Sequence, residues 1–204
     1  MTKNSRFIQH AIDIANDDSH GYSQIRRWGL DFDCSSLMYE CGYYAGYDLP
    51  KEGTRYTGTM IEHFGKCGYR VDAFDGNLND LEPGDILLNT KYHTAVYIGN
   101  GKIVEASCSE TGGIDGATGD QTGNEIHIAT VYDYPWTHVL TPPKEDVNTS
   151  SPVNKESVTS NITVAQAVDR LAIACIHGLF GNGEDRKNRL YERVQKRVNE
   201  INKG

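Results

Sequence analysis

The spacing of apolar residues predicts a helix that begins at Cys34. Leu37, Cys41 and Tyr44 follow at helical spacing and would lie on one face of it. Asp33 stands where an N-cap residue belongs, because its carboxylate can accept the free N–H groups of the first helical turn. Cys34 is therefore expected in that first turn, where the helix dipole stabilises a thiolate and lowers the pKa of the thiol.

Two short strands are predicted within residues 91–107, around the turn Gly99-Asn100-Gly101. His93 opens the first strand, and Glu105 lies on the second. A three-residue turn that ends in a left-handed glycine would place Glu105 opposite Ala95, on the face that carries His93. The glutamate would then be able to reach the imidazole.

A two-residue turn would have the opposite result. Glu105 would pair opposite Val96 and would point away from His93. In that case Asn89 and His127, on neighbouring strands, become the polar candidates to orient the imidazole.

Cysteine at a helix N-terminus facing a histidine on a sheet suits nucleophilic catalysis. The histidine takes the thiol proton, and a third polar group holds the imidazole in place. Cys34 and His93 are therefore candidates for a thiol nucleophile and its base. The alternative is that both are packing residues, which single cysteines and histidines more often are.

Two further segments have features of turns and loops. Residues 82–85 are typical of a turn that delivers the following strand, which is a structural role. The Gly- and Thr-rich run 107–124 is predicted to be a long loop. Because loops of that length in compact domains are often functional, we expect this one to border the substrate groove.

The chain divides into three parts by composition. Residues 1–143 would form a catalytic domain, residues 144–160 a polar linker without periodicity, and residues 161–204 a small helical module. Within the module, one helix is predicted from Thr163 to His177 and a second after the glycine-rich turn at 181–183.

Charge is distributed unevenly over these parts. The 204-residue chain has a formal net charge of −8 at pH 7. The first part holds 10 Lys and Arg against 20 Asp and Glu, whereas the tail holds 8 against 5. A basic tail would offset the repulsion between an acidic domain and a polyanionic surface. Ordinary variation in composition explains the difference equally well.

Several classes of protein are disfavoured. No stretch approaches the roughly eighteen apolar residues of a membrane span, and the first residues lack the apolar core of a signal peptide, so we expect synthesis in the cytosol. Five cysteines without regular spacing argue against a disulfide framework. No pair has the Cys-x2-Cys spacing of a zinc site, so we expect no metal and no cofactor.

Three ordered motifs resemble the NlpC/P60 cysteine peptidases, in particular the variant found in phage and prophage endolysins. They are Tyr22-Ser-x3-Arg-Trp-Gly-x3-Asp-Cys-Ser-Ser36, Leu81-Glu-Pro-Gly-Asp-Ile-Leu87 and His93-Thr-Ala-Val-Tyr-Ile-Gly-Asn-Gly-Lys102. The resemblance covers most of residues 5–143. It implies an α+β, papain-like fold in which helices pack on a small antiparallel sheet.

The resemblance also implies roles for individual residues. Cys34 would be the nucleophile, His93 the general base, and Glu105 the residue that orients the imidazole. The family more often has His, Asn or Gln at this third position, but a carboxylate orients and stabilises an imidazolium well. Tyr22 would contact the substrate or the oxyanion. Three further substrate-binding candidates stand around the nucleophile: Trp28, Asp33 and Ser35.

The tail resembles the CW_7 wall-binding repeat of phage lysins, as one copy over residues 162–203. The resemblance rests on His177-Gly-Leu-Phe-Gly-Asn-Gly-Glu-Asp-Arg-Lys-Asn-Arg-Leu190 and Val194-Gln-Lys-Arg-Val-Asn-Glu-Ile201. Between these two segments the chain is a few residues shorter than the usual repeat. Asn182, Gly183 and Arg186 are the expected wall contacts, while a turn without contacts explains the glycines equally well.

Together the two resemblances imply an endolysin, a peptidoglycan hydrolase that cleaves a stem-peptide amide through a thioacyl-enzyme. The expected bond joins γ-D-glutamate to the diamino acid at position three. The alternatives are an N-acetylmuramoyl-L-alanine amidase, a catalytically inactive wall-binding protein and, disfavoured by the tail, an intracellular acyltransferase. Peptidoglycan is the expected partner, without nucleic acid or membrane insertion, and a separate holin would release the protein to the wall.

Overall fold

The computed structural model describes residues 2–144. The chain divides into two units, Met1–Asp146 and Val147–Gly204, and the described residues belong to the first. The predicted linker, the two tail helices and the expected wall contacts at Asn182, Gly183 and Arg186 lie outside the described residues. None of the helices within residues 2–144 is long and apolar enough to cross a bilayer.

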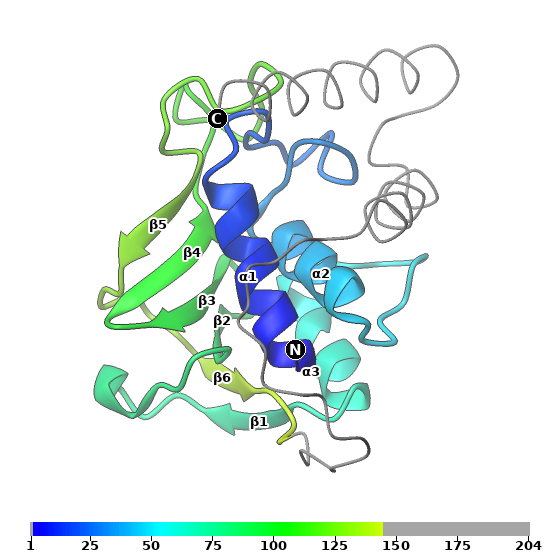
Figure 1. Cartoon of the computed structure of the whole chain (residues 1–204), viewed down its shortest axis with the longest axis vertical. Helices are drawn as coiled ribbons and strands as arrows, with labels where there is room; N and C mark the ends of the chain where they lie inside the picture. The colour runs from blue at the N-terminus through cyan, green and yellow to red at the C-terminus, as the bar shows by residue number, and fades with distance from the viewer. Residues whose placement is uncertain (1, 145–204) are drawn as a thin grey trace, which may run out of the picture. The chain divides into compact units, whose positions relative to one another are not determined.

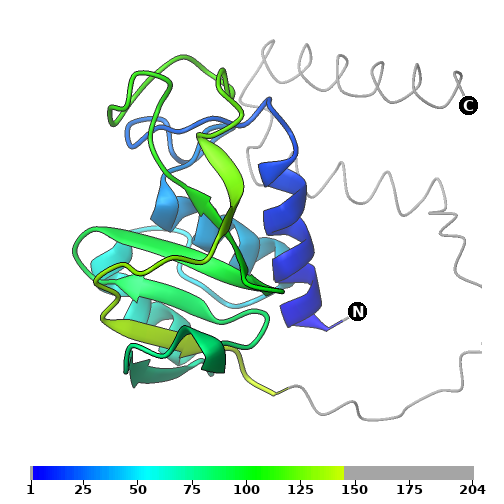
Figure 2. The same ribbon diagram turned by 90° about the vertical axis from the view of Figure 1, so that its left-hand side faces the viewer.

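Three helices come first in the chain: α1 (Lys3–Ala15), α2 (Cys34–Ala45) and α3 (Thr57–Lys66). Helices α1 and α2 lie side by side on one face of a sheet (Figure 1). In the turned view of Figure 2 the strands lie to the left of α1. The helical layer therefore covers a single face of the sheet.

Six strands make up the sheet: β1 (Arg70–Ala73), β2 (Ile86–Asn89), β3 (His93–Gly99), β4 (Lys102–Ala106), β5 (Ile126–Thr130) and β6 (His138–Thr141). A short 3-10 helix, η1 (Leu78–Asp80), follows β1. The strand order is β1-β6-β2-β3-β4-β5, and every neighbouring pair is antiparallel. The predicted α+β fold, with helices packed on an antiparallel sheet, is confirmed.

The central strands alternate between two apolar faces. Side chains on one face, among them Leu88, Val96 and Val104, pack with the helices in the main core. The other face carries Ala95 and Ile103, in a second core cluster that lies away from the helices. Because side chains two residues apart share a face, His93 and Glu105 belong to this second face.

Helix α2 is almost entirely enclosed. Leu37 and Cys41 are fully buried, as the predicted apolar face requires. Tyr44 was assigned to the same face, and this prediction is wrong: its side chain is 40% exposed and stacks on His10 of α1 with ring centroids 3.9 Å apart. The reason is that the buried stripe of α2 is centred on Met38, Cys41 and Ala45, so Tyr44 lies at its edge, where the neighbouring helix offers a surface ring.

The turn between β3 and β4 has two residues, which is the alternative that was expected to turn Glu105 away from His93. Asn100 and Gly101 both have positive φ, 54° and 68°, as in a type I′ turn, and Gly99 pairs with Lys102 across it. Such a turn matches the twist of the flanking strands, and asparagine followed by glycine is its preferred sequence. This local preference decides the loop length.

A bulge in β3 then corrects the register. The pairing shifts between Tyr97 and Gly99, so that Val96 pairs with Val104. Continuing that register places Glu105 opposite Ala95, which is the predicted pairing. The extra residue therefore lies within the strand rather than in the turn, and the consequence for Glu105 is the same.

We expect Gly101→Ala to destabilise the domain by about 1 kcal/mol, because a left-handed conformation costs alanine roughly that much. The φ of Gly101 is 68°, and nothing lies within 4 Å of a Cβ added there, so only backbone conformation is changed. Gly65→Ala in α3 is the matched control: its Cβ would meet Val71 at 4.0 Å, and alanine should stabilise the helix by about 1 kcal/mol. Urea unfolding measures both changes, and a Gly101→Ala protein as stable as wild type would contradict the turn geometry.

Candidate active site

The start of α2 is fixed by a capping box, as the sequence predicted for Asp33. Asp33 Oδ1 accepts hydrogen bonds from the Ser36 backbone N–H at 2.7 Å and from Ser35 Oγ at 2.9 Å. In return, Ser36 Oγ accepts the backbone N–H of Asp33 at 2.9 Å. These reciprocal bonds set the direction in which the chain enters the helix, and Cys34 is the first helical residue.

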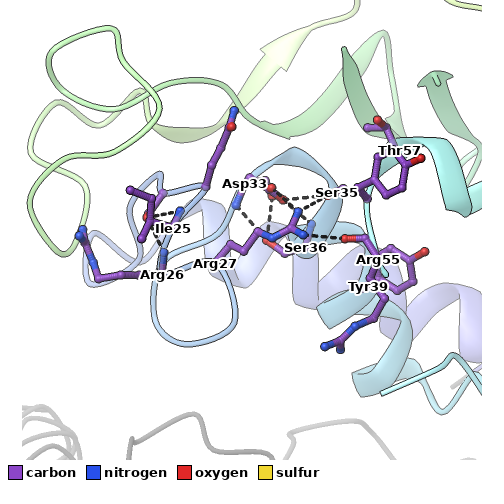
Figure 3. Close-up of polar contacts among 12 residues, drawn as sticks. Ile25, Arg26, Arg27, Asp33, Ser35, Ser36, Tyr39, Arg55 and Thr57 are labelled. Carbon is purple, nitrogen blue, oxygen red and sulfur yellow. Dashed lines mark hydrogen bonds and ion pairs between the residues drawn. The ribbon is translucent and has the colours of Figure 1, made fainter. Parts of the chain in front are cut away.

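Arg27 supports the same helix start from outside (Figure 3). Its Nη1 donates to Asp33 Oδ2 at 2.7 Å, and its Nη2 donates to the Arg55 carbonyl at 2.9 Å. Asp33 is thereby compensated by a cation although it is buried. The substrate contacts predicted for Asp33 and Ser35 stay predictions, since in the structure both side chains bind groups of the helix start.

Cys34 is buried, with 8% of its surface exposed. Burial, with a smaller effect of the Asp33 carboxylate, raises the pKa of its thiol to about 12, against backbone hydrogen bonds that lower it. The predicted lowering of the thiol pKa is therefore wrong, because loss of water around a thiolate outweighs the helix N-terminus. At neutral pH the resting thiol keeps its proton and needs a base to remove it.

His93 opens β3 directly before Thr94, a residue whose backbone reaches the thiol through a hydrogen bond. His93 Nε2 lies 2.7 Å from Glu105 Oε2. Because a carboxylate only accepts, Nε2 carries the hydrogen and Nδ1 is the basic nitrogen of the ring.

Glu105 is buried, with 4% of its surface exposed, and three side chains face its carboxylate. His93 and the Tyr132 hydroxyl both approach Oε2, the latter at 2.8 Å, and His127 Nε2 lies 3.5 Å from Oε1. Burial alone would raise the pKa of Glu105, but the hydrogen bonds from His93 and Tyr132 lower it below the ordinary value. The glutamate is therefore ionised at neutral pH and faces His93, as the predicted register requires.

An aromatic segment between β5 and β6 encloses His93, and the sequence analysis missed it. Trp136 stacks on the imidazole at 5.8 Å between ring centroids, and Tyr134 meets the imidazole edge-on at 5.6 Å. Trp136 Nε1 also donates to the Tyr132 carbonyl at 3.3 Å. The signal in the sequence was the run Tyr132-Asp-Tyr-Pro-Trp136, whose three aromatic residues recur at the strand period of two.

The NlpC/P60 family matches residues 20–141, which is more than half of the chain. This chain belongs to the NlpC/P60 family. The family consists of cysteine peptidases and hydrolases that act on peptidoglycan. A CW_7 repeat matches residues 169–201, inside the segment where the sequence resemblance was found.

Several solved structures are similar to this NlpC/P60 chain. NlpC1 from Trichomonas vaginalis is 17% identical with a TM-score of 0.43, over 69% of this chain and 44% of that one. The P60 domain of an antigen from M. avium subspecies paratuberculosis is 18% identical with a TM-score of 0.42, over 68% and 96%. The peptidoglycan hydrolase RipB from Mycobacterium tuberculosis is 17% identical with a TM-score of 0.45, over 68% and 65%. This chain thus spans less than half of the Trichomonas protein, and a search of curated proteins finds no match.

Tyr22 and Trp28 of the NlpC/P60 domain were predicted to bind substrate. Tyr22 is buried, and its hydroxyl accepts a hydrogen bond from Gln24 Nε2 at 2.9 Å. Burial raises the pKa of Tyr22 to about 12, and the nearby Cys34 adds to the increase. Trp28 is 41% exposed, and the Arg55 guanidinium lies 3.9 Å from its ring centroid. Tyr22 thus lies near the thiol, and Trp28 offers an aromatic surface to solvent.

The two alternative orienting residues of the NlpC/P60 domain have different positions. Asn89 pairs directly opposite His93 in the β2–β3 ladder, but its Nδ2 donates to the Pro135 carbonyl at 2.6 Å and so anchors the aromatic segment. His127 lies directly opposite Glu105 in the β4–β5 ladder and faces the carboxylate from the other side. Within residues 2–144, no group of three or more His, Cys, Asp or Glu side chains is arranged to hold a metal ion.

The long loop predicted after β4 is present, since residues 107–125 contain neither helix nor strand. It packs beside the segment that leads into α2, and the two loops lie together at one end of the domain (Figures 1 and 2). The Gly119 N–H donates to Asp31 Oδ1 at 3.0 Å, and the Tyr22 N–H donates to Glu125 Oε2 at 2.9 Å. Because Tyr22 lies near Cys34, the loop extends to the edge of the candidate site.

Proposed function

We propose that this chain is a peptidoglycan hydrolase that cleaves an amide bond of the stem peptide by thiol chemistry. The observation that supports this proposal is the His93–Glu105 pair at 2.7 Å, on a strand whose next residue, Thr94, forms a backbone hydrogen bond with Cys34, within a domain of the NlpC/P60 family. Cys34 is the proposed nucleophile, His93 the general base and Glu105 the orienting residue. The glutamate, unusual at this position, does not favour an inactive wall-binding protein, because it is ionised and bonded to the imidazole.

In the proposed reaction, His93 Nδ1 takes the thiol proton as Cys34 Sγ attacks the amide carbonyl carbon. The Glu105 carboxylate offsets the charge of the imidazolium that forms. The free N–H groups at the start of α2 are donors for the developing oxyanion. His93 then protonates the leaving amine, and a water deprotonated by His93 hydrolyses the thioacyl-enzyme and restores the thiol.

We assign the γ-D-glutamyl bond to the diamino acid as the bond that is cut, on the strength of the family resemblance. An N-acetylmuramoyl-L-alanine amidase would use the same three side chains in the same way. Mass spectrometry of digested wall fragments distinguishes the two. A new amino terminus on the diamino acid supports the endopeptidase, and a new amino terminus on L-alanine replaces that assignment with the amidase.

We further propose that the protein acts as a phage or prophage endolysin, made in the host cytoplasm and released to the wall by a separate holin. The combination of an NlpC/P60 domain with a CW_7 repeat supports this proposal. The repeat would bind the wall through Asn182, Gly183 and Arg186, and the acidic catalytic domain would depend on it for targeting.

Residues 1–143 alone should cleave soluble muropeptides as the full chain does, but should bind and lyse intact cells less well, by roughly tenfold or more. The loss follows because one of two linked binding modules is removed while the proposed catalytic residues are kept. Co-sedimentation with purified walls and turbidity loss of cell suspensions measure the two effects. Residues 161–204 alone should bind walls without cutting them. Equal wall binding by the truncated and full-length proteins would exclude a targeting role for the tail.

A further inference from the structure

We propose that Tyr132 is a positioning residue that keeps the Glu105 carboxylate on His93 rather than on His127. The inference rests on the proposed function, because it concerns the same site. It assigns a role to the segment after β5, from which the sequence predicted no site residue.

The first observation is that two donors converge on one oxygen. The Tyr132 hydroxyl donates to Glu105 Oε2 at 2.8 Å, and His93 Nε2 lies 2.7 Å from the same atom. A glutamate carboxylate rotates freely about its last torsion, so a single donor leaves its plane poorly defined. A second donor on the same oxygen fixes that plane and the direction in which Oε2 points.

The second observation is a competing histidine. His127 pairs directly opposite Glu105, and its Nε2 lies 3.5 Å from Oε1. Its Nδ1 is buried without a hydrogen-bond partner among the described residues. His127 therefore competes with His93 for the carboxylate, since Glu105 is the acceptor that faces it.

The third observation is that Tyr132 is itself held in place. Its ring meets Tyr134 edge-on at 6.1 Å between centroids, and its carbonyl accepts Trp136 Nε1 at 3.3 Å. Burial and the hydrogen bond to Glu105 raise the pKa of Tyr132, so its hydroxyl stays a donor throughout the neutral range. The contacts with Tyr134 and Trp136 thus fix the position of the Tyr132 hydroxyl beside Glu105.

The groups that face Glu105 come from three elements: His93 on β3, His127 on β5 and Tyr132 after β5, with Cys34 and Tyr134 nearby. Without the Tyr132 hydroxyl, the carboxylate turns toward His127 and stabilises the His93 imidazolium less well. Proton transfer from the thiol then becomes slower, while the surface that binds substrate is unchanged. The effect should therefore appear in kcat and not in KM.

The experiment compares the full-length wild type with Tyr132→Phe on a soluble muropeptide. We expect kcat to fall roughly tenfold to hundredfold with KM nearly unchanged, and alkylation of Cys34 by iodoacetamide at pH 7 to slow in parallel. Tyr44→Phe is the matched control, because it removes a hydroxyl from an exposed ring on the far end of α2. An unchanged kcat in a folded Tyr132→Phe protein would overturn the proposal.

His127→Phe provides the second test, because it removes the competitor and leaves Tyr132 in place. We expect Tyr132→Phe/His127→Phe to have a higher kcat than Tyr132→Phe alone. A double variant no faster than Tyr132→Phe would refute the competition. Cys34→Ala distinguishes failure of the proposed function from failure of the inference about Tyr132. If this variant is as active as wild type, the proposed function fails. If it is inactive, the Tyr132 results test the inference alone.

Discussion

Cys34→Ser should lower the rate of muropeptide hydrolysis on the order of 10⁴-fold or more, as removal of a catalytic nucleophile does. The hydroxyl is similar in volume but is a far weaker nucleophile at neutral pH. In the structure burial raises the pKa of even the thiol to about 12. A hydroxyl is less acidic than a thiol, so His93 would deprotonate serine far less readily. Hydrolysis is measured by mass spectrometry or by release of amino groups from purified fragments.

The matched control for this substitution is Cys67→Ser, at another free cysteine that is partly exposed on the C-terminal side of α3. It should keep the wild-type rate. Both variants should unfold near the wild-type temperature and bind walls as wild type does, because neither changes the fold or the tail. Substantial hydrolysis by the Cys34→Ser protein would remove the basis for the thiol mechanism.

Glu105→Gln should lower kcat on the order of 10³-fold, because an uncharged amide cannot offset the charge of the His93 imidazolium. The amide keeps the size of the side chain and its ability to accept a hydrogen bond, so substrate binding should be nearly unchanged. Glu62→Gln is the control: it also removes a paired carboxylate, but this one lies on the exposed surface of α3 beside Lys66. Wild-type kcat in the Glu105→Gln protein would transfer the orienting role to another group.

The same substitution has a pH signature in stability. Hydrogen bonds from His93 and Tyr132 hold the pKa of Glu105 below its ordinary value in the folded protein. The ionised carboxylate therefore stabilises the fold above the pKa that glutamate has in the unfolded chain, and this stabilisation is lost as the pH falls through the lowered pKa. Thermal unfolding should show wild type above Glu105→Gln at pH 7, with the gap closing in acid. A gap that widened in acid would be inconsistent with an ionised Glu105.

Much of the candidate site was predictable from the sequence because it depends on contacts between near neighbours. The N-cap at Asp33 and the helix start at Cys34 follow from bonds within four residues. The strand opening at His93 follows from alternation and from the turn signal at Asn100-Gly101. The family followed from the same motifs, and the match over residues 20–141 confirms it.

The tertiary structure alone decided the features that depend on distant segments. The face of Glu105 was conditional in the sequence, because a bulge within β3 compensates for the short turn and no local signal marks it. The pKa of Cys34 moved opposite to the prediction, because desolvation depends on everything that packs around the thiol. Tyr132, with His127 beyond the carboxylate, meets Glu105 only because the sheet and the chain after β5 bring together residues more than twenty positions apart. Helix capping and strand alternation depend on residues close together in the sequence and can be predicted from it, whereas burial and cross-strand neighbours exist only once the chain has folded.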